Sequence, residues 1–143
     1  MDYLKIDEVA KQTGLTKRAI RYYEEIGLLE TPQRTDGGTR LYTEEDIIFL
    51  QRLILARDVL GFSLNELQHY LKESQALELD RTDYPSITDP LQQRDKLAKM
   101  VNSIDKQVEM LIEKTNKIEK VRKELEHLRE RATTKIQQID GDQ

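Results

Sequence analysis

The sequence predicts a mainly α-helical protein, in which a small N-terminal head of short helices is followed by one long coiled-coil helix. Charged residues make up 35% of the 143 residues, whereas glycine occurs 6 times and proline 3 times, which is typical of helices and coiled coils. Helix-capping residues and glycine turns divide residues 1–72 into short elements. Apolar residues four and three apart then recur along the C-terminal half.

The head is organised around residues 16–30, which we expect to form a two-faced helix. Thr16 can cap its N-terminus through its hydroxyl, and Gly27 can end it in a left-handed conformation. One face carries Lys17, Arg18, Arg21 and Tyr22, and the other carries Ala19, Ile20, Tyr23 and Ile26. A capped helix with such a cationic face suits entry into a DNA groove, and a solvated charged face is the alternative.

The net charge and the scarcity of cysteine and histidine limit which binding sites this protein can have. The formal net charge is −4, and residues 1–72 hold 10 basic and 12 acidic residues, so any nucleic-acid surface must be a local basic patch. The absence of cysteine excludes disulfides, thiolate metal sites and cysteine redox switches, and 2 histidines argue against a histidine-rich site. We therefore expect no metal and no cofactor.

Membrane and secretion signals are also missing from the sequence. No apolar run approaches the roughly 20 residues of a membrane span, and the N-terminus lacks a signal-peptide pattern. We expect a soluble, cytoplasmic protein without membrane contacts.

A glycine corner precedes the two-faced helix. Residues 7–13 read as a short helix with acids in its first turn, Gly14 as the turn and Leu15 as the plug of the corner. Two short helices joined by a glycine-containing turn are the helix-turn-helix pattern.

A hairpin is predicted directly after the two-faced helix. Pro32 blocks further helix, and Asp36-Gly37-Gly38 separates two short strands, residues 33–35 and 39–42. Such a hairpin is the wing of a winged helix-turn-helix domain. Arg34 and Arg40 flank its tip, where guanidinium groups could grip phosphates; incidental arginines on a surface hairpin are the alternative.

Two capping boxes complete the head. Thr43 with Asp46 opens an apolar-periodic helix, and Ser63 with Glu66 opens a short second one. We therefore predict a winged helix-turn-helix domain over residues 1–72.

Taken in order, these motifs resemble the N-terminal domain of the MerR family of transcription regulators. The matching positions are Ile6–Gly14, Arg21–Glu24, Gly27–Leu29, Pro32, Arg34, Gly38, Arg40, Tyr42, Asp46 and Leu60–Ser63. One departure lies at the wing tip, where the family usually has an aromatic residue between glycine and arginine and this chain has Thr39.

The resemblance implies a DNA-binding surface. Residues Thr16, Lys17 and Arg18 would approach base edges in the major groove, and Thr39 would lie at the wing tip. The backbone of the duplex would be gripped by Arg21, Tyr22, Arg34, Arg40 and Tyr42. For Tyr23 a phosphate contact and a core position both remain open, since the helical pattern turns it inwards.

The C-terminal half reads as a linker and a dimerisation helix. Residues 73–87 have broken periodicity and a proline, so we expect a linker or a short turn of helix there. A coiled coil over residues 88–132 starts at Asp89 and Pro90, and residues 133–143 read as a flexible tail. The predicted seam consists of Leu97, Val101, Ile104, Val108, Leu111, Thr115 and Ile118. After Ile118 the apolar step slips, with Val121, Leu125 and Leu128 following.

The predicted function is a homodimeric transcription regulator that binds double-stranded promoter DNA. By resemblance it would bend and untwist a palindromic operator to help RNA polymerase. Either a small-molecule effector lies between linker, coiled coil and head, or the protein has no effector. An excisionase-like DNA-architectural factor and a protein-binding coiled-coil adaptor are the alternatives. No nucleophile–base pair or phosphate-cradling loop indicates an enzyme.

Overall fold

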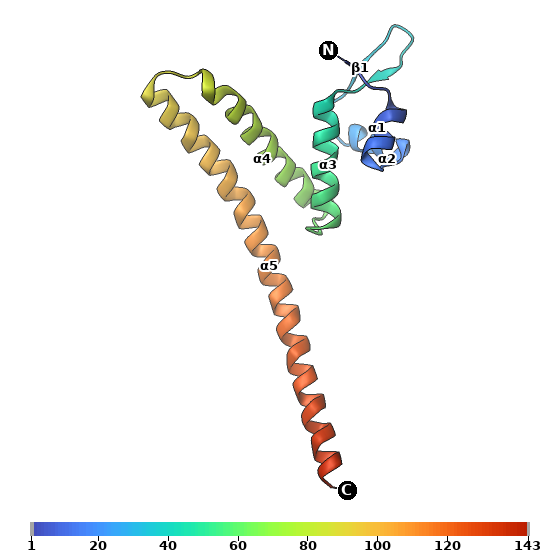
Figure 1. Ribbon diagram of the computed structural model, residues 1–143, viewed down its shortest axis with the longest axis vertical. Coiled ribbons are helices and arrows are strands. Elements are labelled where there is room, and N and C mark those ends of the chain that lie inside the picture. Colours follow the sequence, from blue (N-terminus) through green and yellow to red (C-terminus); the bar gives the residue numbers. More distant parts are fainter. Residues whose placement is uncertain (1, 143) are drawn as a thin grey trace.

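The computed structural model describes residues 2–142 as a head joined to a long helical hairpin (Figure 1). The elements are α1 (Ile6–Thr13), α2 (Lys17–Glu25), β1 (Gln33–Arg34), β2 (Arg40–Leu41), α3 (Glu44–Asp58), α4 (Leu64–Asp83), a 3₁₀ turn η1 (Tyr84–Ser86) and α5 (Pro90–Gly141). The head comprises α1, α2, the two strands and α3. The mainly helical fold with an N-terminal helix-turn-helix and wing is confirmed.

The corner between α1 and α2 forms as the sequence predicts. Gly14 adopts a left-handed conformation with φ 78°, and Leu15 is buried beneath the turn. The Thr16 hydroxyl accepts the Ala19 N–H at 3.0 Å and so begins α2. At the other end Gly27, with φ 80°, ends the helix, since only glycine adopts that conformation without strain.

The wing, residues 33–41, is a two-stranded antiparallel ribbon with shorter strands than expected. Gln33 pairs with Leu41, and Arg34 pairs with Arg40. Directly after it, Tyr42 forms a bridge to Leu4, with backbone bonds of 2.8 Å in both directions. The N-terminal segment therefore fastens the base of the wing to the head.

Helix α3 supplies the centre of the core. Both predicted capping boxes are confirmed, with Thr43 and Ser63 each accepting a backbone N–H of the following helix. The buried side chains of α3 recur at helical spacing and contact α1, α2 and α4; they are Ile47, Leu50, Leu53 and Ala56.

Most of residues 73–87, where we expected a linker or a short turn of helix, continues a long helix. Helix α4 continues to Asp83, and only the short η1 turn and three further residues separate it from α5. The apolar period is broken because polar contacts with α5 hold this part of the helix. Lys96 pairs with Asp80 at 3.3 Å, and Lys106 pairs with Glu73 at 3.5 Å.

The expected flexible tail is also helical as far as the structure describes it. Helix α5 runs for 52 residues, about 78 Å at 1.5 Å per residue, and ends at Gly141. Between Pro90 and Gly141 the sequence has neither glycine nor proline, so nothing local stops the helix at residue 133.

Replacing Leu50 with alanine tests how far the head depends on the α3 core. Leu50 is fully buried, so Leu50→Ala should lower the free energy of unfolding by about 2–5 kcal/mol. Leu55→Ala is the matched control, because Leu55 lies on the same helix and is 54% exposed. In urea denaturation, the free energy of unfolding of this control should change by roughly 0.5 kcal/mol or less. Equal losses would contradict this description of the core.

Candidate nucleic-acid interface

Helix α2 presents a continuous polar face to solvent. Its exposed side chains include Lys17, Arg18, Arg21 and Tyr22, with the cap residue Thr16 before them, as the helical pattern predicted; Glu25 is exposed at the C-terminal end. Lys17 forms an ion pair with Asp7 across the α1–α2 corner, but both side chains are largely exposed. Such a surface pair is weak, and it leaves Lys17 available to a stronger partner.

The wing is fixed beside α2 by a charged hydrogen bond. Arg40 Nε donates to Glu24 Oε2 at 3.0 Å, and the Glu24 side chain is only 9% exposed. The pair links β2 to the C-terminal end of α2. Arg40 is therefore half-buried, with its Nε bonded to Glu24, and the phosphate contact predicted for it stays a prediction.

The remaining wing residues face outwards. Arg34 is exposed on β1, and residues 35–39 form the exposed tip, where Thr35 N donates to Thr39 O at 2.8 Å. Within residues 2–142 Arg34 has no ion pair, unlike Arg40. Arg34 is thus the wing cation best placed to meet a phosphate, and Thr39 lies beside it at the tip.

Two tyrosines lie in the core instead of on this surface. Tyr23 is buried, and its hydroxyl accepts a hydrogen bond of 2.8 Å from Arg57 Nη1. Asp58 and Tyr23 together raise the pKa of Arg57. Of the two roles left open for Tyr23, the structure shows the core position.

Tyr42 differs more sharply from its expected role. Its side chain has no exposed area, and its hydroxyl has no hydrogen-bond partner within the described residues. Burial raises the pKa of Tyr42, and the nearby Glu24 carboxylate raises it further. The backbone contact expected for Tyr42 was implied by the family resemblance, whereas the structure buries this side chain in the core.

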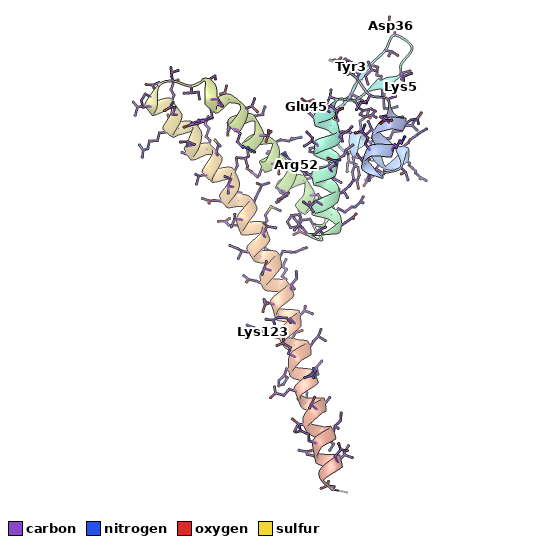
Figure 2. The ribbon with its side chains drawn as sticks, viewed as in Figure 1. Tyr3, Lys5, Asp36, Glu45, Arg52 and Lys123 are labelled. Atoms are coloured by element: carbon purple, nitrogen blue, oxygen red, sulfur yellow. The ribbon has the colours of Figure 1, made fainter. Side chains whose placement is uncertain are left out.

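Sequence reasoning missed the N-terminal segment. Tyr3 and Lys5 are exposed, and Figure 2 shows both beside the base of the wing. The Tyr3 hydroxyl donates to Gln33 Oε1 on β1 at 3.0 Å. Only the long-range bridge between Leu4 and Tyr42 brings this segment here, and no local sequence signal reports it.

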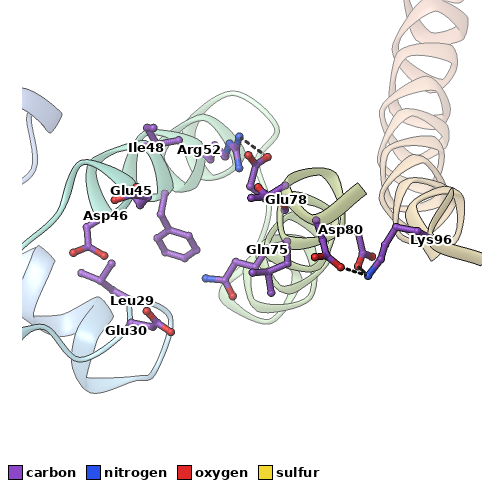
Figure 3. Close-up of a pocket in the computed structure, with 14 residues that line it drawn as sticks. Leu29, Glu30, Glu45, Asp46, Ile48, Arg52, Gln75, Glu78, Asp80 and Lys96 are labelled. Atoms are coloured by element: carbon purple, nitrogen blue, oxygen red, sulfur yellow. Dashed lines mark hydrogen bonds and ion pairs between the residues drawn. The ribbon is translucent and has the colours of Figure 1, made fainter. Parts of the chain in front are cut away.

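A cleft of about 830 Å³ opens on the other side of the head, between α3, α4 and the start of α5 (Figure 3). Its apolar wall includes Leu29, Ile48, Phe49 and Leu79. Six carboxylates and two cations also line it; they are Glu30, Glu45, Asp46, Glu78, Asp80, Asp83, Arg52 and Lys96.

Most of the charges in this cleft are already paired. Lys96 contacts Asp80 and Asp83, which raise its pKa, and Arg52 lies 3.8 Å from Glu78. The cleft lies where an effector was expected, and its surplus of carboxylates favours a positively charged occupant. Within residues 2–142 there is no cluster of side chains suited to hold a metal ion, and no helix apolar enough to cross a bilayer.

Comparison with known proteins identifies relatives of both parts of the chain. Residues 4–74 match the family model described as MerR HTH family regulatory protein. The chain is 43% identical over 140 residues to the HTH-type transcriptional regulator YfmP of Bacillus subtilis (strain 168), covering 98% of this chain and 100% of YfmP. It is 50% identical over 68 residues to the HTH-type transcriptional regulator CueR of Yersinia pestis, covering 48% of each chain.

A solved structure agrees with this assignment. A crystal structure from Listeria monocytogenes, assigned to the MerR family of transcriptional regulators, superposes with a TM-score of 0.55 and 26% identity. The superposition covers 87% of this chain and 80% of the other. The similarity therefore extends beyond the head into the helical hairpin.

Removing the Tyr42 hydroxyl tests whether that residue belongs to the core or to the interface. Tyr42→Phe should leave the unfolding free energy unchanged or raise it by up to about 1 kcal/mol, because an unpaired buried hydroxyl is lost. DNA affinity should not change. Denaturation and DNA titration would be measured together, with Tyr22→Phe as the comparison that removes an exposed hydroxyl from the proposed DNA surface. A selective loss of affinity in Tyr42→Phe would restore its expected role at the duplex.

Proposed function

The chain belongs to the MerR family of DNA-binding transcriptional regulators, and on that premise we propose that it acts as a homodimer on a palindromic promoter operator. Each copy would insert α2 into a major groove and lay its wing against the adjacent backbone. Members of this family are regulators and not enzymes. The proposal names the assembly and the DNA contacts.

The observation that carries the DNA contacts is the exposed cationic face of α2 beside the wing. Thr16, Lys17 and Arg18 lie at the N-terminal end, where a recognition helix meets base edges. Arg21, Tyr22 and Arg34 follow towards the wing, where phosphates would lie. Arg40 supports this surface by fixing the wing to Glu24, and Thr39 stays within reach of the backbone.

The observation that carries the homodimer is a second, apolar face on α5. Less exposed positions recur three and four apart along its first half and face α4; they are Gln93, Lys96, Met100, Ser103, Gln107, Met110 and Lys114. The predicted dimerisation residues lie on the adjacent face. Leu97, Val101, Ile104, Val108 and Ile118 are each at least 41% exposed. An apolar stripe of this length is stabilised when a second helix covers it.

Leu111 differs from the other seam residues. Together with Met110 it packs partly against the head core, so it joins the seam to the head. We propose that two α5 helices pair antiparallel about a two-fold axis near Val108. The apolar residues on either side of Val108 then face one another across the axis, and the two heads point in opposite directions from it.

The two fixed heads would act on DNA through shape. Two half-sites related by the same two-fold axis make the operator palindromic, and bending it costs of order 1–6 kcal/mol. We propose that regulation uses this deformation to change how RNA polymerase meets the promoter. The cleft between α3 and α4 is the proposed site for a small-molecule effector.

Two arginine substitutions separate base reading from backbone binding. Arg18→Ala should lose roughly 1–3 kcal/mol on the cognate operator and much less on scrambled DNA, since it removes a contact to base edges. Arg34→Ala should weaken binding to the cognate operator and to scrambled DNA by similar factors. It should also lower the slope of log affinity against log salt concentration by about one unit per lost contact. Titrations of both variants at several salt concentrations provide the measurement. If neither substitution changes binding, the proposed surface is wrong.

A buried charge tests the dimer. Val108→Asp would place a carboxylate at the two-fold axis, so the dimer should dissociate at micromolar concentration. Asn116→Asp is the matched control, because it adds the same charge to an exposed position beside the seam. Sedimentation of wild type as a monomer would contradict the proposal, as would a Val108→Asp variant that remains fully dimeric.

A further inference from the structure

One carboxylate lies between the cations of α2 and those of the wing. Glu24 is on α2, one turn after Arg21, and it is half-buried where β2 crosses the end of that helix. The carboxylate of Glu25, the next residue, is exposed instead. An acid inside a surface that meets phosphates repels them. The position of Glu24 therefore indicates a role that outweighs this repulsion.

The bond from Arg40 to Glu24 uses only part of the guanidinium group. Arg40 Nε donates to both oxygens of the Glu24 carboxylate, at 3.0 Å to Oε2 and 3.4 Å to Oε1. A guanidinium has five N–H donors, one on Nε and four on its two Nη atoms. Within residues 2–142 the Nη atoms of Arg40 donate no hydrogen bond, and 27% of the side chain is exposed. Four donors are thus left for an acceptor outside the chain.

The surroundings of Glu24 make it a rigid support for that guanidinium. Its side chain is only 9% exposed, so water competes little with the charged bond to Arg40. Burial raises the pKa of Tyr42 and the Glu24 carboxylate raises it further, so the carboxylate lies close to this buried ring. Because the Nε–H and Nε–Cδ bonds both lie in the guanidinium plane, a bond to Nε fixes that plane.

A fixed guanidinium binds an anion at a lower entropic cost than a free one. Ordering one long side chain on association weakens binding by about two- to tenfold, and a side chain that is already held avoids this loss. Arg21 adds a second cation, because Arg21 and Arg40 both act against the rise in the pKa of Tyr42 and so lie near the same hydroxyl. The junction of α2 and the wing therefore brings two cations together, one of them held in place.

We propose that Glu24 is a positioning residue, which holds Arg40 through Nε so that its Nη groups bind a DNA phosphate beside α2. The inference rests on the proposed DNA interface and assigns a role to the acid within it. Two phosphate oxygens match the paired Nη donors as a bidentate acceptor. The phosphate would lie on the side of the guanidinium away from Glu24, so attraction to Arg40 exceeds repulsion by the more distant carboxylate.

Replacing Glu24 with alanine tests this role through the sign of the effect. Removal of an acid near DNA should strengthen binding if only charge matters, whereas loss of the positioning bond should weaken it by about two- to tenfold per copy. Operator and scrambled duplexes should be affected alike, because a phosphate contact carries no sequence information. Glu25→Ala is the matched control, since it removes the same charge from the adjacent position, and its affinity should be unchanged or slightly higher.

Folding of the full-length variants is checked by circular dichroism. If Glu24→Ala unfolds, Glu24→Gln provides the test, because it keeps the size of the side chain and weakens the charged bond to a neutral one. Glu24→Gln should also bind DNA more weakly than the wild type does. Affinity equal to or above that of Glu25→Ala, in whichever Glu24 variant folds, overturns the proposal.

Two double-mutant cycles separate positioning of one side chain from anchoring of the whole wing. In an Arg40→Ala background, Glu24→Ala should no longer weaken binding, because the guanidinium that it positions is gone. In an Arg34→Ala background, Glu24→Ala should weaken binding by the same factor as in the wild type. Coupling of Glu24 to Arg34 as strong as its coupling to Arg40 would show that Glu24 fixes the whole wing, and would overturn the proposal.

The outcomes also separate this inference from the proposed function. If Arg18→Ala and Arg34→Ala weaken binding but Glu24→Ala strengthens it, the positioning role is wrong and the DNA interface remains. If substitution of Arg18, Arg34 and Arg40 leaves binding unchanged, the interface itself is wrong, and the positioning role fails with it.

Discussion

Polar contacts between α4 and α5 set the direction in which the long helix leaves the head. Lys96, Lys106 and Lys114 each reach a carboxylate on α4, and Gln107 donates to a backbone carbonyl of that helix. Because these polar residues occupy one face of α5, the apolar face points outwards. The geometry of any dimer, and thus the spacing of two heads on DNA, depends on this division of faces.

The head separates its charges in the same way. An acidic protein can bind DNA when its cations gather on one surface and its carboxylates lie elsewhere. Here Arg18, Arg21 and Arg34 are exposed on α2 and the wing, while Glu24 is half-buried and paired with Arg40. The uncompensated acids line the cleft between α3 and α4, on another side of the head. The net charge of −4 therefore says little about the surface that meets DNA.

Features fixed by neighbouring residues could be predicted from the sequence. The Thr16 cap, the capping boxes at Thr43 and Ser63, and the left-handed glycines at positions 14 and 27 depend on a few adjacent side chains. Features set by distant contacts could not. Leu4 reaches Tyr42 across most of the head, and Glu24 holds Arg40, and neither contact has a local sequence signal. From residue 73 we expected a linker or a short turn of helix, because the longer helix is held by polar partners on α5.

Beside the apolar packing of Met110 and Leu111, the ion pairs of the α4–α5 contact have a consequence for the mechanics of the molecule. Ion pairs at partly exposed positions weaken as salt screens them, whereas an interlocked apolar core does not. Helix α4 is 20 residues long, about 30 Å, so a tilt of about 5° at one end displaces the other by roughly 2–3 Å. Ionic strength therefore acts on this protein twice. It screens the cationic surface of the head, and it loosens the joint that aims that surface.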